Sequence, residues 1–173
     1  APARGLGDVY KRQGKYGAPV QTLLKKASAL DIKTICPLHG PVLSDNLGYY
    51  LDLYNTWSSY QPESKGVFIA YASIHGNTAY AAEQFAEMLR NKGVDNVVIT
   101  DLSRCDIAEA VEDAFRYDRM VLAAASYDAG VFPIMQDFLH HLQAKAFQNR
   151  TVGLIENGSW APTAAKTMRN ILE

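Results

Sequence analysis

Four short apolar runs alternate with stretches of helical periodicity over the second two thirds of the chain. The runs have the length of buried strands and lie at 66–72, 96–101, 119–125 and 151–156. Between them, apolar side chains recur every three or four residues, as in helices that cover a sheet. This alternation predicts an α/β fold with a doubly wound parallel sheet.

The first predicted strand leads into a helix through a segment with the chemistry of a phosphate site. Its residues are Ser73, Ile74, His75, Gly76, Asn77 and Thr78. A glycine in such a turn lets successive backbone N–H groups point into one concavity at the positive end of the helix. The segment has neither the lysine of a nucleotide-hydrolysing loop nor the G-x-G-x-x-G spacing of dinucleotide folds. The ligand type that remains is a terminal monophosphate held by neutral donors, as in FMN. The alternative is ordinary helix capping by the same residues.

Two more loops follow the carboxyl ends of predicted strands, where open α/β sheets bind ligands. One contains Ser126, Tyr127, Asp128, Ala129 and Gly130, and the other contains Asn157, Gly158, Ser159 and Trp160. Turn formation alone accounts for their small and polar residues. It does not account for one aromatic residue in each loop, whereas a flavin ring needs flat apolar cover. We therefore expect Tyr127 and Trp160 to flank such a ring.

Together with an upstream segment, these loops resemble the flavodiiron proteins, also called A-type flavoproteins. The matching segments are ICPLHGP at 35–41, the phosphate loop, residues 126–142 and ENGSWAP at 156–162, in the order that this family uses. The resemblance extends over about residues 16–173. It implies a metallo-β-lactamase-like domain with two irons, followed by a flavodoxin-like domain with FMN.

The chain departs from the family at both ends. Its four histidines, His39, His75, His140 and His141, form no H-x-E or H-x-D motif. By resemblance His39 matches the last metal ligand of the diiron domain, but a lone histidine does not make a stable metal site, and a polar loop residue is the alternative. At the other end, the flavodoxin-like sheet is expected in the strand order 2-1-3-4, with strand five and its helix missing.

The sequence patterns and the resemblance together predict a division of the chain into four parts. Residues 1–13 are expected to be non-native or disordered, and 14–43 to be the C-terminal tail of the metallo-β-lactamase-like domain, with a short strand at 33–37. Residues 44–65 are predicted to form a bridging helix, with Ser44 as its N-cap, and a linker. Residues 66–173 are predicted to be the flavodoxin-like FMN domain, truncated at its C-terminus.

Composition narrows the choice of partners and compartment. Hydrophobic residues make up 48% of the chain, charged residues 20%, and the net charge is −1. No basic stripe and no apolar run of membrane-spanning length occurs, so neither nucleic acid nor a membrane is expected as a partner. Cys36 and Cys105 lie far apart in unrelated contexts, which favours free thiols and the cytoplasm.

By resemblance, the intact protein is an oxidoreductase that passes electrons through FMN to a diiron site, where oxygen is reduced to water or nitric oxide to nitrous oxide. The implied donor is rubredoxin or a flavin/NADH-linked reductase, and the implied assembly is a head-to-tail homodimer. The diiron site belongs to the intact protein only, so this fragment alone is not expected to be catalytically competent. A free-standing flavodoxin-like electron carrier and a flavin-less interaction domain remain as alternatives.

Overall fold

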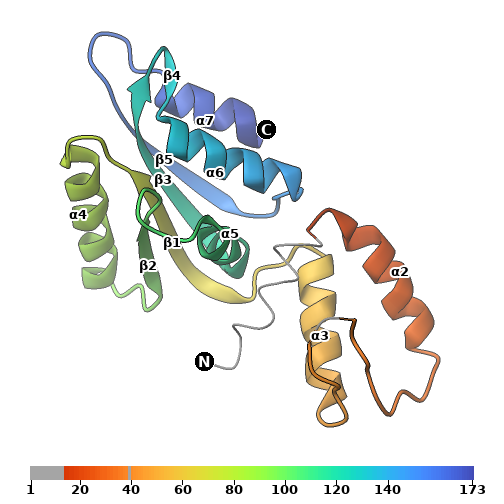
Figure 1. Cartoon of the computed structure of the whole chain (residues 1–173). Coiled ribbons are helices and arrows are strands. Elements are labelled where there is room, and N and C mark those ends of the chain that lie inside the picture. Colours follow the sequence, from red (N-terminus) through yellow and green to blue (C-terminus); the bar gives the residue numbers. More distant parts are fainter. Residues whose placement is uncertain (1–13, 39) are drawn as a thin grey trace.

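A parallel β-sheet forms the centre of the computed structural model, which describes residues 14–38 and 40–173 (Figure 1). Its parallel strands are β1 (Ser64–Ala72), β2 (Val97–Asp101), β3 (Tyr117–Tyr127) and β5 (Thr151–Asn157), in the order β2-β1-β3-β5. A short β4 (Gly130–Val131) runs antiparallel to the end of β3. Because β5 is the fourth of the expected strands, the predicted order 2-1-3-4 is confirmed.

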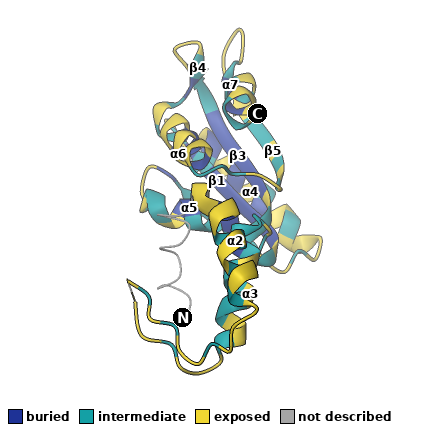
Figure 2. Cartoon of the chain, turned by 90° about the vertical axis from the view of Figure 1, so that its right-hand side faces the viewer, coloured by how far each residue is buried: buried dark blue, intermediate teal, exposed yellow. Residues whose placement is uncertain are grey.

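The strand register places the carboxyl ends of β1, β3 and β5 at one edge of the sheet. Ala72 pairs with Ala124, which in turn pairs with Glu156. The central strands carry long runs of buried residues, as Figure 2 shows for β1 and β3. Such runs are typical of parallel strands with helices on both faces.

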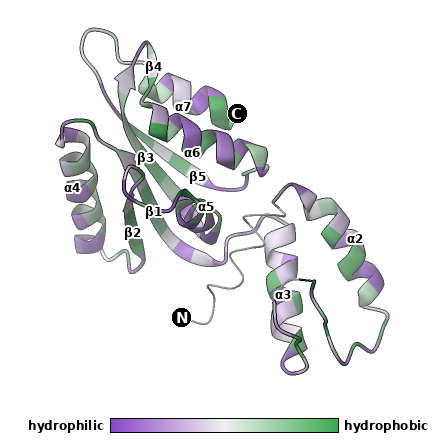
Figure 3. Ribbon diagram, viewed as in Figure 1, coloured by the Kyte–Doolittle hydropathy of each residue, from purple (hydrophilic) through white to green (hydrophobic). Residues whose placement is uncertain are grey.

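Helices cover both faces of the sheet and divide the apolar residues into two cores (Figure 1). Helix α4 (Asn77–Asn91) packs on one face, where Ala82 and Ala86 meet Ile69. Helices α5 (Ile107–Arg116), α6 (Pro133–Ala144) and α7 (Ala164–Leu172) pack on the other, around Phe68. Adjacent residues of β1 thus enter opposite cores, as the period of a strand requires. In Figure 3 the strands are mostly green and the outer side of α4 is purple.

A helical pair lies at the amino-terminal end of the strands, opposite the edge where β1, β3 and β5 end (Figure 1). It consists of a single turn η1 (Gly14–Tyr16), helix α2 (Gly17–Ala27) and helix α3 (Leu47–Ser58). A Cβ on Gly17 would lie only 2.5 Å from the carbonyl oxygen of Ser58, so the close approach of the two helices requires glycine there. The amide of Gln21 also donates to the side chains of Asn55 and Ser58 across the pair.

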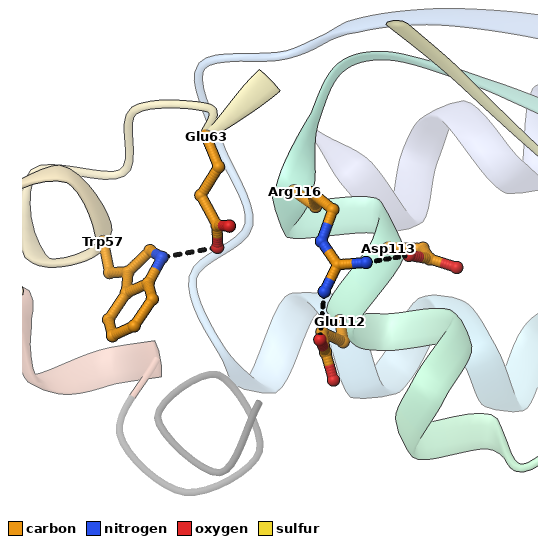
Figure 4. Close-up of polar contacts among 5 residues, drawn as sticks. All are labelled: Trp57, Glu63, Glu112, Asp113 and Arg116. Atoms are coloured by element: carbon orange, nitrogen blue, oxygen red, sulfur yellow. Dashed lines mark hydrogen bonds and ion pairs between the residues drawn. The ribbon is translucent and has the colours of Figure 1, made fainter. Parts of the chain in front are cut away.

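Buried polar contacts join this pair to the sheet. Trp57 is 5% exposed and its indole N–H donates to the carboxylate of Glu63, just before β1 (Figure 4). The backbone N–H of Glu63 donates to the carbonyl of Arg116 at 2.9 Å. The guanidinium of Arg150 donates to the carbonyls of Tyr60 and Phe115. These contacts fix the linker after α3 to the end of α5.

Two expectations for the N-terminal part are wrong. Instead of a strand at 33–37, the structure has a single bridge between Ile35 and Leu43, and Pro37 has no N–H with which to extend the pairing. Ser44 does not cap the bridging helix: α3 begins at Leu47, and its N-cap is Asn46, in the left-handed conformation (φ 50°) that asparagine tolerates. Residues 1–13 and His39, for which we predicted disorder and a metal-ligand position, lie outside the described residues.

Within the described part of the chain, every helix is too short or too polar to cross a lipid bilayer.

Candidate functional site

The three loops predicted to bind a ligand all lie at the same edge of the sheet. They follow β1, β3 and β5, whose ends are in register. In Figure 1 the β3–β4 hairpin and the connection from β5 to α7 project side by side beyond the sheet, and the loop before α4 emerges from the same edge. The register therefore gathers the predicted site residues at one edge.

The loop between β1 and α4 has the backbone geometry of an anion site. Gly76 lies in the left-handed region (φ 89°) and is the N-cap of α4, and no described side chain caps that helix. The first intrahelical bond runs from the N–H of Tyr80 to the carbonyl of Gly76, so the N–H groups of the first turn have no partner within the helix. These N–H groups and the positive end of α4 face the loop.

Side chains of this loop divide into buried and exposed ones. Thr78 is only 5% exposed, whereas Ile74, His75 and Asn77 are exposed. The hydroxyl of Ser73 accepts the N–H of Gly76 at 3.0 Å, which closes the loop on itself and leaves the hydroxyl hydrogen able to donate. Within the described residues, no atom outside the immediate neighbours of Gly76 in the chain lies within 4 Å of a Cβ built on it. The space beside this glycine is therefore open to a ligand.

The segment after β3 folds into a tight hairpin. Tyr127 pairs with Gly130, and the two residues between them, Asp128 and Ala129, both have positive φ (45° and 57°). This is the conformation of a type I′ turn, the usual two-residue connection of a hairpin. The Tyr127 ring lies 5.8 Å from the Phe132 ring and remains 45% exposed. One face of the tyrosine is thus supported while the rest is open to a partner.

The loop after β5 presents an aromatic side chain without cover. Trp160 is fully exposed (102%) and has φ 58°, and Ser159 beside it is exposed as well. Asn157 still pairs with Ala125 in the sheet, so the loop proper begins at Gly158. A large apolar side chain exposed at a ligand-binding edge is typical of a site that a flat ring would cover.

Ser126 links the last two loops. Its Oγ accepts the backbone N–H groups of Thr163 at 2.8 Å and Ala164 at 3.2 Å, and so caps the start of α7. The Thr163 hydroxyl donates to the carbonyl of Gly130 at 2.9 Å. Sequence reasoning missed Thr163, because its hydroxyl does not cap its own helix but reaches across to the hairpin, and no local pattern signals such a contact.

Two titratable side chains beyond the predicted site lie near this edge, and both favour their neutral forms. Burial raises the pKa of the Tyr71 phenol, and the carboxylates of Asp101 and Glu83 raise it further. Burial likewise raises the pKa of the Cys105 thiol. Among residues 14–38 and 40–173, no group of three or more His, Cys, Asp or Glu side chains is arranged to hold a metal ion.

Comparisons with known proteins agree with this geometry. The putative diflavin flavoprotein A 4 of Synechocystis is 27% identical over 158 residues, which are 89% of this chain and 26% of that protein. The coenzyme F420H(2) oxidase of Methanothermobacter marburgensis is 29% identical over 121 residues, 70% of this chain and 29% of that protein. The chain therefore spans less than a third of these two relatives.

Solved structures share the fold over nearly the whole chain. The flavodiiron protein of Giardia intestinalis superposes with a TM-score of 0.88 at 20% identity, over 96% of this chain and 41% of that one. Rubredoxin oxygen:oxidoreductase of Desulfovibrio gigas gives a TM-score of 0.82 at 19% identity, over 92% of this chain and 40% of that one. At these identities the likeness shows the fold. Residues 68–173 match the flavodoxin domain, and the chain belongs to that family.

Proposed function

We propose that this chain is the FMN-binding, electron-transfer portion of a flavodiiron oxidoreductase. The observation that carries the proposal is the loop from Ser73 to Thr78, where uncapped N–H groups at the start of α4 face open space beside Gly76. The loop holds neutral donors and no lysine or arginine, which fits one terminal phosphate rather than a triphosphate. Relatives named as diflavin flavoproteins support the choice of a flavin.

The remaining predicted residues fit the rest of FMN. We assign Ser73, Ile74, His75, Gly76, Asn77 and Thr78 to the phosphate. We assign the ring to the loops Ser126, Tyr127, Asp128, Ala129 and Gly130, and Asn157, Gly158, Ser159 and Trp160. Tyr127 and Trp160 offer exposed aromatic faces at that edge. Bound FMN supplies the electron-transfer chemistry, and these residues bind the ring, orient it and exclude water from it.

The whole protein is proposed to extend beyond this chain, because its relatives are longer. We propose that 14–43 is the tail of a metallo-β-lactamase-like domain, 44–65 a bridging helix and linker, and 66–173 the flavodoxin-like domain. In the intact protein, a diiron site with His39 as one ligand would reduce oxygen or nitric oxide. The matched solved structures of flavodiiron proteins support this reading.

The partners follow from the same proposal. One of the matched structures is a rubredoxin oxygen:oxidoreductase, and we propose rubredoxin or a flavin/NADH-linked reductase as the donor. A head-to-tail homodimer would bring the FMN of one subunit close to the irons of the other. The free thiols of Cys36, which is exposed, and Cys105 favour a reducing compartment such as the cytoplasm.

A free-standing flavodoxin-like carrier is the second candidate, and the helical pair argues against it. Helices α2 and α3 precede the sheet and are tied to it through Trp57 and Arg150, although a flavodoxin would begin near β1. A flavin-less interaction domain is the third candidate. It would leave the exposed Trp160 without a ligand.

Titration of the purified chain with FMN, FAD and NAD tests the proposed function. Intrinsic tryptophan fluorescence is the readout, because Trp160 lies at the proposed ring site and Trp57 is buried elsewhere. We expect FMN to bind with the lowest Kd. FAD binding that equals or exceeds FMN binding would refute the phosphate assignment, and absence of any flavin binding would favour the interaction domain.

A further inference from the structure

The hydroxyl of Ser126 accepts hydrogen bonds from within the chain. It accepts the N–H groups of both Thr163 and Ala164, which are the N-cap and first residue of α7. These two bonds connect the end of β3 to the loop that carries Trp160. Both acceptor sites of the Ser126 hydroxyl are thus used within the chain, and its hydrogen is left as the donor for a ligand.

We propose that Ser126 and Thr163 are positioning residues that lock together the two loops flanking the flavin ring. This inference rests on the proposed function, because it concerns how that site is held. It gives Ser126 a supporting role besides its place in the ring loop, and it adds Thr163, whose hydroxyl ties the loop before α7 to the carbonyl of Gly130 in the hairpin.

Gly158 provides an independent reason to treat the two loops as one unit. A Cβ built there would lie 2.8 Å from Oγ and 3.0 Å from Cβ of Ser126, and 3.2 Å from Cα of Pro162. The chain after β5 therefore passes directly over Ser126, and only glycine leaves room for that approach. The bonds and the close packing act on the same pair of loops.

A carboxylate bond also strengthens the start of α7. Oε2 of Glu156, at the end of β5, accepts the N–H of Ala165 at 2.9 Å. The first N–H groups of α7 are thus satisfied by β3 and β5, whereas those of α4 have no side-chain cap within the described residues. One helix start is closed by the protein, and the other remains open for a ligand.

Locked loops reduce the conformational entropy that flavin binding must overcome. Tyr127 on the hairpin and Trp160 on the neighbouring loop would be held near their binding positions before the ring arrives. Loss of either hydrogen-bonded tie should therefore weaken the binding of FMN, even where the altered side chain makes no contact with the flavin. If binding has to supply the free energy that such a cap gave to the order of the loops, the FMN Kd rises about fivefold to tenfold.

The test compares Ser126→Ala and Thr163→Val with matched controls, using the full chain. Ser103→Ala removes an exposed hydroxyl at the same edge, and Thr167→Val removes a hydroxyl that donates to the Thr163 carbonyl at the start of its own helix. Amide hydrogen exchange over residues 157–165 is measured without flavin, and FMN Kd is measured by titration. Thr163→Ser, which keeps the hydroxyl, serves as the rescue.

We expect faster exchange and an FMN Kd about five to ten times higher in Ser126→Ala and Thr163→Val, with both controls and Thr163→Ser near wild type. Weaker FMN binding in Ser126→Ala alone, with exchange unchanged, would identify Ser126 as a direct ligand contact and overturn the inference. Faster exchange with unchanged FMN affinity would show that the two bonds serve only to cap α7, and this result would also overturn the inference. If the wild-type chain binds no FMN, the proposed function itself fails, and the inference fails with it.

Discussion

The indole N–H of Trp57 in α3 donates to the carboxylate of Glu63, the residue before β1 (Figure 4). This bond crosses the junction between the helical pair and the sheet. Replacement of Trp57 by Phe removes the donor and part of a buried ring, and leaves a carboxylate without this partner. We expect Trp57→Phe to lower the free energy of unfolding by about 1 to 3 kcal/mol.

Urea denaturation followed by circular dichroism measures this loss, since the signal does not depend on tryptophan. Tyr80→Phe is the control, because Tyr80 is 65% exposed on α4. An unchanged unfolding midpoint in Trp57→Phe would show that the junction contributes nothing to stability.

Thr78 is the buried polar residue of the phosphate loop, and its hydroxyl is expected to donate to the phosphate. Loss of a charge-assisted hydrogen bond costs about 1 to 3 kcal/mol, so Thr78→Ala should weaken the free energy of FMN binding by that amount. Thr78→Ser keeps the hydroxyl and should bind FMN nearly as well as the wild type. Equal Kd values for the Ala and Ser variants would argue that the hydroxyl does not bind the phosphate.

Trp160 should quench the fluorescence of bound flavin by stacking on or beside the ring. Aromatic stacking contributes about 0.5 to 1.5 kcal/mol in addition to the free energy of burying the surface. Trp160→Ala should therefore weaken the binding of FMN and partly restore the fluorescence of the bound flavin. A purely structural role, in which Trp160 would pack under the last helix, is excluded by its full exposure. We therefore expect the stability of the flavin-free variant to change by no more than about 0.5 kcal/mol.

The measurement is flavin emission at saturating FMN, with Tyr80→Phe as an aromatic variant outside the site. Quenching that is unchanged in Trp160→Ala would rule out the stacking role.

The chain is expected to hold no stoichiometric iron and to react with oxygen only through slow oxidation of its flavin. The reason is that a stable iron site needs several ligands, and the expected upstream ligands of His39 do not occur in this sequence. Metal analysis after anaerobic loading with iron is the test. Two tightly bound irons per chain would contradict the prediction.

Cys105 should react with alkylating reagents more slowly than Cys36. Burial raises the pKa of the Cys105 thiol, so a smaller fraction of this side chain is thiolate near pH 8 than of an ordinary cysteine. The alkylation rate of Cys105 should therefore rise only as the pH passes through that elevated pKa. Cys36 is exposed. The variants Cys36→Ser and Cys105→Ser separate the two rates, and equal rates at pH 8 would contradict the burial of Cys105.

The sheet was predictable from sequence because buried parallel strands are apolar on both faces. The run at 66–72 lies within β1, and Asp106 caps α5 by accepting the N–H of Ala108, as an aspartate directly before a helix commonly does. Family resemblance predicted the strand order, which a count of apolar runs does not give. The assignment of ligand contacts to individual residues remains a prediction.

The missed features depend on tertiary contacts or unusual backbone angles. Strand β4 is only Gly130–Val131, and the turn before it places Ala129 at φ 57°, which alanine rarely adopts. Helix α2 was not predicted, although Pro19 in its first turn was an available signal. The close approach of Gly158 to Ser126 joins the loop after β5 to β3, and no local pattern marks it.

The contact between Arg150 and Tyr60 has a consequence for how the chain is made. The two residues are 90 positions apart, so the guanidinium reaches its carbonyl only after β1, β2 and β3, which lie between them, have been synthesised. Helices α2 and α3 can pair earlier, because their contacts are closer in sequence. During synthesis we therefore expect the helical pair to form before Arg150 ties its linker to the sheet.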